Sequence, residues 1–243
     1  MTKLDDFNKM IRGGHEISKV YHLNQEIWND SGLIAGDMEA GFYGEVPTSD
    51  FITGDGLCSL AGITAGTSQY SNEPWLKFSY LGETVFVSKK PIRYNISWSN
   101  INSAGCVFGG KTVTIKGQRY KVTLLKGKTE GKQNDTSANS GSILHNSMWN
   151  KLMGQIHVGA PSNWDSPNNM ESTLVNWGIN YTDADVVMHR NYGNGSYSWC
   201  QEYGDSTSVR QFRGVSGVSG SSSVDYTRAH NYYGFRPALI LVP

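Results

Sequence analysis

Three carboxylates in the last third of the chain are the residues best suited by type to acid–base chemistry. Asp183 and Asp185 lie two residues apart in YTDADVV, and on a strand this spacing places both side chains on one face. With Glu202 they could supply the two carboxylates of a glycoside hydrolase. The same spacing fits an Asx-type turn that leads into a strand at Val186–His189. Paired carboxylates are also common in structural roles, so hydrolysis ranks last among three hypotheses.

Histidines and cysteines form no familiar catalytic or metal-binding motif. The six histidines contain no HxxxH or HxH spacing, and the sequence has no GxSxG, P-loop or GxGxxG segment. The cysteines are odd in number, far apart and without a CxxC pair, so we interpret them as buried thiols: Cys58, Cys106 and Cys200. The sequence therefore predicts no catalytic residue, no metal and no cofactor.

Aromatic residues concentrate in two polar segments near the C-terminus, Asn191–Gly204 and Val224–Pro237. Rings set among Gly, Ser and Asn are typical of recognition surfaces, because they give contact area at low entropic cost. The first segment yields four candidate ligand-binding residues: Tyr192, Asn194, Tyr197 and Tyr203. We expect Trp199, in the same segment, to fill the core instead.

The elements that would carry these residues are short helices and antiparallel strands. We expect a helix from Thr2, a hairpin over 16–28, a short helix near 56–60, and strands within 75–90 and 91–98, the last alternating at period two. A second hairpin over 111–127 turns at Lys116-Gly117. The apolar spacing of Trp149, Leu152, Met153 and Ile156 predicts a helix over 147–156. This order of elements indicates the α+β class.

The chain ends on an apolar run, PALILV, in contrast to the polar segments before it. A strand apolar on both faces is expected at the centre of a sheet that is covered on each side. Leu239 and Leu241 are therefore predicted core residues, and Gly234 would permit a close backbone approach. We expect Arg236 to cap a chain end or pair with a buried carboxylate such as Glu202.

Composition limits the classes of partner. The 243 residues have zero formal net charge and are 17% charged, which gives no attraction to nucleic acid or to an acidic membrane surface. No apolar run approaches the roughly 20 residues needed to span a bilayer. The N-terminus lacks the apolar core of a signal peptide, so we expect synthesis in a cytoplasm without membrane insertion.

Four segments in fixed order resemble a domain found in proteins of tailed phages and prophages: SMWNKLM, SYSWCQE, RQFRGVSG and YYGFRPALIL. That domain is similar to the formylglycine-generating-enzyme fold, a variant of the C-type-lectin-like fold. The resemblance covers 141–243 best, and upstream segments also resemble phage virion proteins. The enzymes with this fold use a pair of cysteines, whereas this half of the chain holds Cys200 alone. The resemblance therefore implies a binding scaffold.

The resemblance implies two parts and a location in the virion. Residues 1–30 would dock the chain on other virion proteins, and 31–243 would form a C-type-lectin-like body with a polar internal loop at about 128–142. Our first hypothesis is a structural protein of a bacteriophage virion, in the tail, collar or head decoration, that forms a homo-oligomer. The second is an adhesin for host surface glycan or protein. As structural residues we name Trp149, Trp199, Gly234, Arg236, Leu239 and Leu241.

Overall fold

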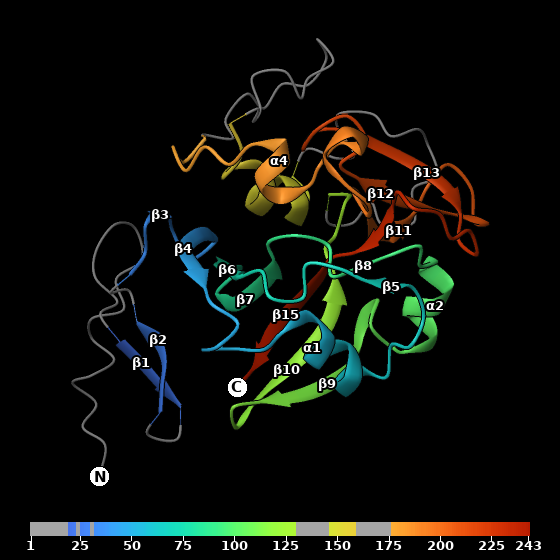
Figure 1. The fold of residues 1–243 in the computed structure, drawn as a ribbon. Helices are drawn as coiled ribbons and strands as arrows, with labels where there is room; N and C mark the ends of the chain where they lie inside the picture. The colour runs from blue at the N-terminus through green and yellow to red at the C-terminus, as the bar shows by residue number, and fades with distance from the viewer. Residues whose placement is uncertain (1–18, 23–24, 30–31, 130–145, 159–175) are drawn as a thin grey trace.

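The chain folds as a strand-rich α+β protein, as the sequence predicts. The computed structural model describes residues 19–22, 25–29, 32–129, 146–158 and 176–243. Its strands form a two-stranded, a seven-stranded and a six-stranded sheet (Figure 1). No helix in these residues is long and apolar enough to cross a membrane.

The N-terminal hairpin is confirmed as a separate two-stranded sheet. Strand β1 (Lys19–His22) pairs antiparallel with β2 (Gln25–Asn29), with Val20 opposite Trp28. Neither strand joins the two larger sheets (Figure 1). The helix predicted from Thr2 lies outside the described residues.

The terminal strand occupies the interior of the seven-stranded sheet. Strand β15 (Pro237–Val242) pairs antiparallel with β7 and with β10, so that Leu239 lies opposite both Phe86 and Val122. The sheet order is β3 (Ala35–Gly36), β4 (Ala40–Val46), β6 (Trp75–Tyr80), β7 (Glu83–Ser88), β15, β10 (Gln118–Leu124) and β9 (Phe108–Ile115). The predicted central position of PALILV is thus confirmed.

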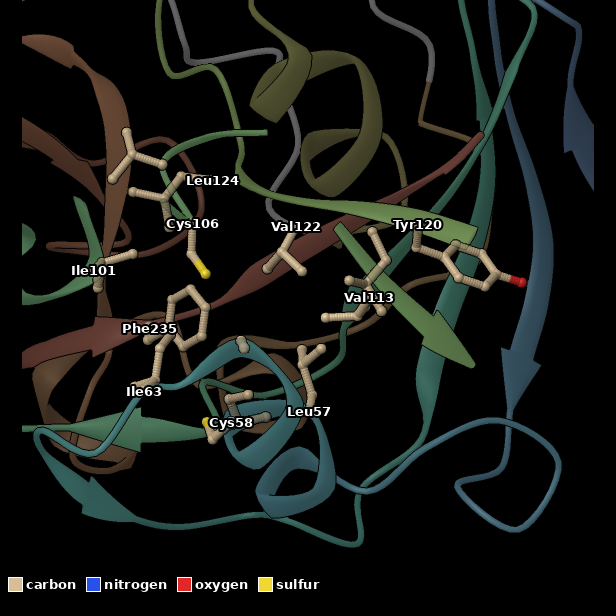
Figure 2. Close-up of a cluster of buried hydrophobic side chains, with 14 of the residues drawn as sticks. Leu57, Cys58, Ile63, Ile101, Cys106, Val113, Tyr120, Val122, Leu124 and Phe235 are labelled. Carbon is tan, nitrogen blue, oxygen red and sulfur yellow. The ribbon is translucent and has the colours of Figure 1, made fainter. Parts of the chain in front are cut away.

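A hydrophobic core covers each face of this sheet. Leu239 is buried in the first core, with Leu241 packed against it, whereas Ala238 is buried in the second core. In Figure 2, side chains from α1 (Gly54–Ala61), β9 and β10 gather around Phe235 in the first core. The second core contains Trp149 and its helical neighbours. Because both faces are covered, the first three residues of β15, Pro237 to Leu239, are all buried and all apolar.

The six-stranded sheet is connected to the seven-stranded sheet through β14, the strand that directly precedes β15. Its order is β13 (Ser221–Asp225), β12 (Val209–Arg213), β11 (Tyr197–Tyr203), β14 (Tyr233–Phe235), β8 (Arg93–Tyr94) and β5 (Thr67–Ser68). Only Arg236 separates β14 from β15. A Cβ on Gly234 would collide with the carbonyl oxygen of Gly195, so the predicted close approach is confirmed.

One predicted strand, over 91–98, is largely wrong. Only Arg93–Tyr94 pair as a strand, because Asn95 takes a positive φ of 54° that ends the extended backbone. Ser97 then caps helix α2 (Trp98–Ser103): its hydroxyl accepts from the Asn100 amide, and the Asn100 side chain bonds back to Ser97. Ile92, Ile96 and Trp98 are buried, but Ser97 is buried too and Tyr94 is only half-buried, so burial does not follow the period-two alternation.

The helix predicted around Trp149 exists but is wider than an α-helix. Its centre is the π-helical turn η2 (Asn150–Gly154). Its four predicted apolar residues are all fully buried: Trp149, Leu152, Met153 and Ile156. The polar loop expected at 128–142 begins inside the fold, because Lys128 is buried at 1% exposure; residues 130–142 lie outside the described residues.

Candidate functional site

Two of the three candidate acids lie on a single turn of helix, not on a strand. Helix α4 (Asp183–Val186) begins after Thr182, and the Asp185 carboxylate accepts from the Thr182 amide at 2.8 Å and hydroxyl at 2.6 Å. These bonds lower the pKa of Asp185. The predicted strand at 186–189 is absent, since Val187 takes a left-handed φ of 53°. Asp185 therefore completes the capping box of α4, whose N-cap is Thr182.

Asp183 and Glu202 have separate structural partners. The Asp183 carboxylate lies 3.1 Å from Nε2 of His157, whose pKa is lowered chiefly by burial. Glu202 is buried on β11, and its Oε2 accepts from the Gly127 amide at 2.9 Å. Burial raises the pKa of Glu202 to about 7. The three acids thus take part in different interactions, and the structure does not bring them together as a hydrolase pair.

Arg236 does not pair with Glu202, and that prediction is wrong. Its guanidinium donates from Nε to the Ser198 hydroxyl at 3.0 Å, from Nη1 to the Ser88 carbonyl at 3.1 Å, and also to the Lys89 carbonyl. Nη2 donates to two further carbonyls, of Val186 and Val187. Burial lowers the pKa of Arg236 to about 9, so the group stays protonated at neutral pH. It joins the end of β7, β11 and α4.

A second buried arginine ties β12 to the helix at Trp149. Nη2 of Arg213 donates to the Asn150 side chain at 2.7 Å, and Nη1 donates to the Gly127 carbonyl at 3.1 Å. Its Cζ also lies 5.7 Å from the Trp149 ring. Burial lowers the pKa of Arg213 to about 10. Gly127 therefore bridges two charged side chains, because its amide bonds Glu202 and its carbonyl bonds Arg213.

The four predicted ligand-binding residues have four different sets of partners. Tyr192 is 50% exposed, and its ring centroid lies 5.8 Å from that of His189. Tyr197 is half-buried and stacked on Phe212 at 5.3 Å. Asn194 is exposed, and its carbonyl accepts from Gln69 at 3.0 Å. Trp199 is 1% exposed, as predicted for a core residue.

Tyr203, the last of the predicted residues, belongs to a cluster that the sequence did not reveal. Its ring centroid lies 4.1 Å from Cζ of Arg210, which is also 4.3 Å from the Trp98 ring and 5.5 Å from the Tyr226 ring. Phe108 packs edge-on against Trp98 at 5.9 Å. We call this cluster the Arg210 patch: Trp98, Phe108, Tyr203, Arg210 and Tyr226.

The Arg210 patch has a fixed floor and an accessible rim. Trp98 is buried and held by a 2.9 Å hydrogen bond from Nε1 to the Cys200 carbonyl. Above it, Phe108 is 64% and Tyr226 37% exposed. The Ser99 amide donates to the Tyr226 carbonyl, which joins α2 to the chain after β13. The five residues come from α2, β9, β11, β12 and the end of β13, so no short motif could have signalled them.

Arg210 carries a charge that no carboxylate neutralises among the described residues. Nη1 donates to the carbonyls of Thr207 and Val209 at 2.9 and 3.0 Å. Nε and Nη2 form the other edge of the guanidinium; they have no protein acceptor, and both reach solvent. Burial lowers the pKa of Arg210. Nε and Nη2 of Arg210 can therefore donate two hydrogen bonds to one bidentate acceptor beside the aromatic rings.

Other clusters fit structural roles better. Glu45 accepts from Lys89 at 2.7 Å and from the Tyr181 hydroxyl at 2.5 Å, which closes a polar contact between β4 and the segment before α4. A pocket of about 220 Å³ beside α2 is lined by 62–65 and by Asn100, Ser103 and Ala104, with no charged side chain.

The thiols and the possible metal ligands offer no reactive centre in the described part of the chain. Cys58, Cys106 and Cys200 are all buried, as predicted, and burial raises the pKa of each thiol. No group of three or more His, Cys, Asp or Glu side chains could hold a metal ion among the described residues. No protein-family model, curated protein or solved structure matches the chain, so function must be inferred from its own residues.

Proposed function

We propose that this chain is a structural protein of a bacteriophage virion, placed in the tail, collar or head decoration. Its residues 31–243 would form a C-type-lectin-like body, and residues 1–30 would dock that body on neighbouring virion proteins. The chain would assemble as a homo-oligomer, because virion proteins are commonly symmetric.

The observation that carries this proposal is the location of the phage-like sequence segments. Asn150, Glu202, Arg213 and Arg236 come from the four segments on which the resemblance rests, and all are buried polar residues. Arg213 bonds Asn150 directly, and Gly127 links Arg213 to Glu202. Buried polar networks specify one arrangement of the elements that they join. Three of the segments are thus joined to one another, which supports reading them as hallmarks of a shared scaffold.

The hairpin supports the docking role of the N-terminus. Among the described residues, strands β1 and β2 pair with each other and with no other strand, and an isolated two-stranded hairpin is at best marginally stable in water. A neighbouring subunit would supply the surface that such a hairpin requires.

Particles purified from the strain that encodes the chain provide the test. Mass spectrometry should find the full chain at a fixed ratio to the major virion proteins through a density gradient. A chain lacking residues 1–30 should keep the circular dichroism of the body but be lost from particles. Absence of the full chain from particles would refute the proposal, whereas equal incorporation of the shortened chain would refute only the docking role.

The second candidate is an adhesin that recognises host surface glycan or protein. The Arg210 patch favours it, because exposed rings beside an unneutralised guanidinium are suited to recognition. This candidate uses the same lectin-like body and the same virion location. It adds a ligand, and a glycan-binding assay on the purified chain tests it directly.

A further inference from the structure

We propose that the Arg210 patch binds an anionic glycan through a sugar carboxylate. The inference rests on the adhesin form of the proposed function and names its ligand class. The guanidinium edge would hold the carboxylate, and the exposed rings of Phe108 and Tyr226 would contact the sugar ring.

The geometry of Arg210 is suited to a carboxylate rather than to a neutral group. Nε and Nη2 lie on one edge of the planar guanidinium and match the two oxygens of a carboxylate in a bidentate pair. Among the described residues this edge has no acceptor, since both hydrogen bonds that the Arg210 side chain donates leave from Nη1. Those two bonds fix the guanidinium, so little side-chain freedom remains to be lost on binding.

The surrounding charges permit an anion to approach. Asp225, the acid next to Tyr226, turns its carboxylate onto the amide and hydroxyl of Thr227, at 2.8 and 2.5 Å. Asp205 likewise accepts from the Ser223 hydroxyl at 3.1 Å. Neither acid forms an ion pair with Arg210 among the described residues, and Arg210 is the one charged side chain of the five that make up the patch. The patch therefore presents positive charge.

A sugar is the class of anion that the aromatic rim favours. Phe108 and Tyr226 are both exposed, and both make edge-on contacts with the buried Trp98. Rings of this kind pack against the apolar face of a pyranose. A single-stranded nucleic acid also stacks on rings, but its backbone requires a basic groove. The chain has zero net charge, which favours the glycan.

The test uses the full chain and two matched pairs of probes, sialyllactose with lactose, and trigalacturonate with its methyl ester. Isothermal titration should show each acidic probe binding at least about tenfold more tightly than its neutral partner, the factor expected for one charge-assisted pair. Arg210→Ala should remove this preference, and Arg210→Lys should restore only part of it because Lys lacks the fork. Phe108→Ala should weaken both members of a pair. Arg119→Ala, at an exposed arginine on β10 outside the patch, should change nothing.

Several results would overturn the inference. These are no binding of any probe at millimolar concentration, equal binding of acidic and neutral probes, or an unchanged acid preference in Arg210→Ala. Tighter binding of oligothymidylate than of either acidic glycan would also overturn it. If Arg210→Ala fails to fold, the acid preference of the wild-type chain and its loss in Arg210→Gln decide. Because none of these assays uses particles, failure here leaves the virion proposal to its own test.

Discussion

Replacing Arg236 by Met should strongly destabilise the protein, although Met fits an apolar environment. Arg236 is 1% exposed and donates to five oxygen atoms, four of which are backbone carbonyls: Ser88, Lys89, Val186 and Val187. The substitution removes the donor but leaves the carbonyls in place. It therefore differs from the exchange of a whole ion pair for apolar residues, which is often neutral.

The magnitude follows from the carbonyls that lose their donor. Each buried acceptor left without a partner costs about 1–3 kcal/mol. Backbone shifts and entry of water relieve part of this cost, so we expect a total loss of about 3–5 kcal/mol for Arg236→Met. Arg236→Lys keeps the charge but offers three donors on one nitrogen, which cannot span acceptors from β7, β11 and α4. We expect it to lose about half as much.

Urea unfolding monitored by tryptophan fluorescence measures these losses. The control is Arg119→Met, at an exposed arginine on β10, which should stay within about 0.5 kcal/mol of the wild-type chain. A loss below about 1 kcal/mol for Arg236→Met, with an unchanged denaturant slope, would refute the reasoning. So would full stability of Arg236→Lys, the decisive variant if Arg236→Met does not fold.

Three further predictions follow from buried groups. The pKa of Glu202, raised by burial from 4.5 to about 7, means that its contribution to stability is fully present below pH 4.5 and is lost as the pH rises through 7. The unfolding free energy of the wild-type chain minus that of Glu202→Gln should therefore fall by about 3 kcal/mol between pH 4.5 and 8; a constant difference would contradict this. In the folded protein the three buried thiols should react with a thiol reagent at pH 8 at least about 100-fold more slowly than in the chain unfolded by urea. A thiol that reacts rapidly in the folded protein would show that this cysteine is not buried. A chain ending at Tyr233 lacks β15 and should show no cooperative thermal transition by circular dichroism, whereas removal of Pro243 alone should have no effect.

Features set by local backbone geometry could be predicted from the sequence. The hairpin over 111–127 turns where expected, because Lys116 and Gly117 both take the positive φ that a two-residue turn requires. The turn at Leu81-Gly82 is of the same kind and joins the two predicted strands of 75–90. The apolar run of β15 also indicated its place, because only an interior strand is covered on both faces.

Partners that are backbone atoms could not be predicted. Arg236 is bonded mostly by carbonyl groups, which every residue possesses, so no acidic residue in the sequence marks its partner. The strand predicted over 91–98 was wrong for a related reason. Ser97 caps a helix there, and alternating apolar residues in the sequence do not distinguish a strand from a loop that is followed by a helix. Glu202 and Asp183 attracted attention as acids, but their roles depend on tertiary neighbours.

Three arginines of the six-stranded sheet and its flanks show how surroundings separate structural from binding roles. Arg213 and Arg236 are fully buried, and their guanidinium groups donate hydrogen bonds to carbonyl and side-chain oxygens. Arg210 is fixed in the same manner at Nη1, yet its other edge reaches solvent beside exposed rings. A guanidinium that only stabilised the fold would gain nothing from this second edge. Because fixation lowers the entropic cost of ordering the side chain, the same contacts that restrain Arg210 would favour the anion binding that we propose.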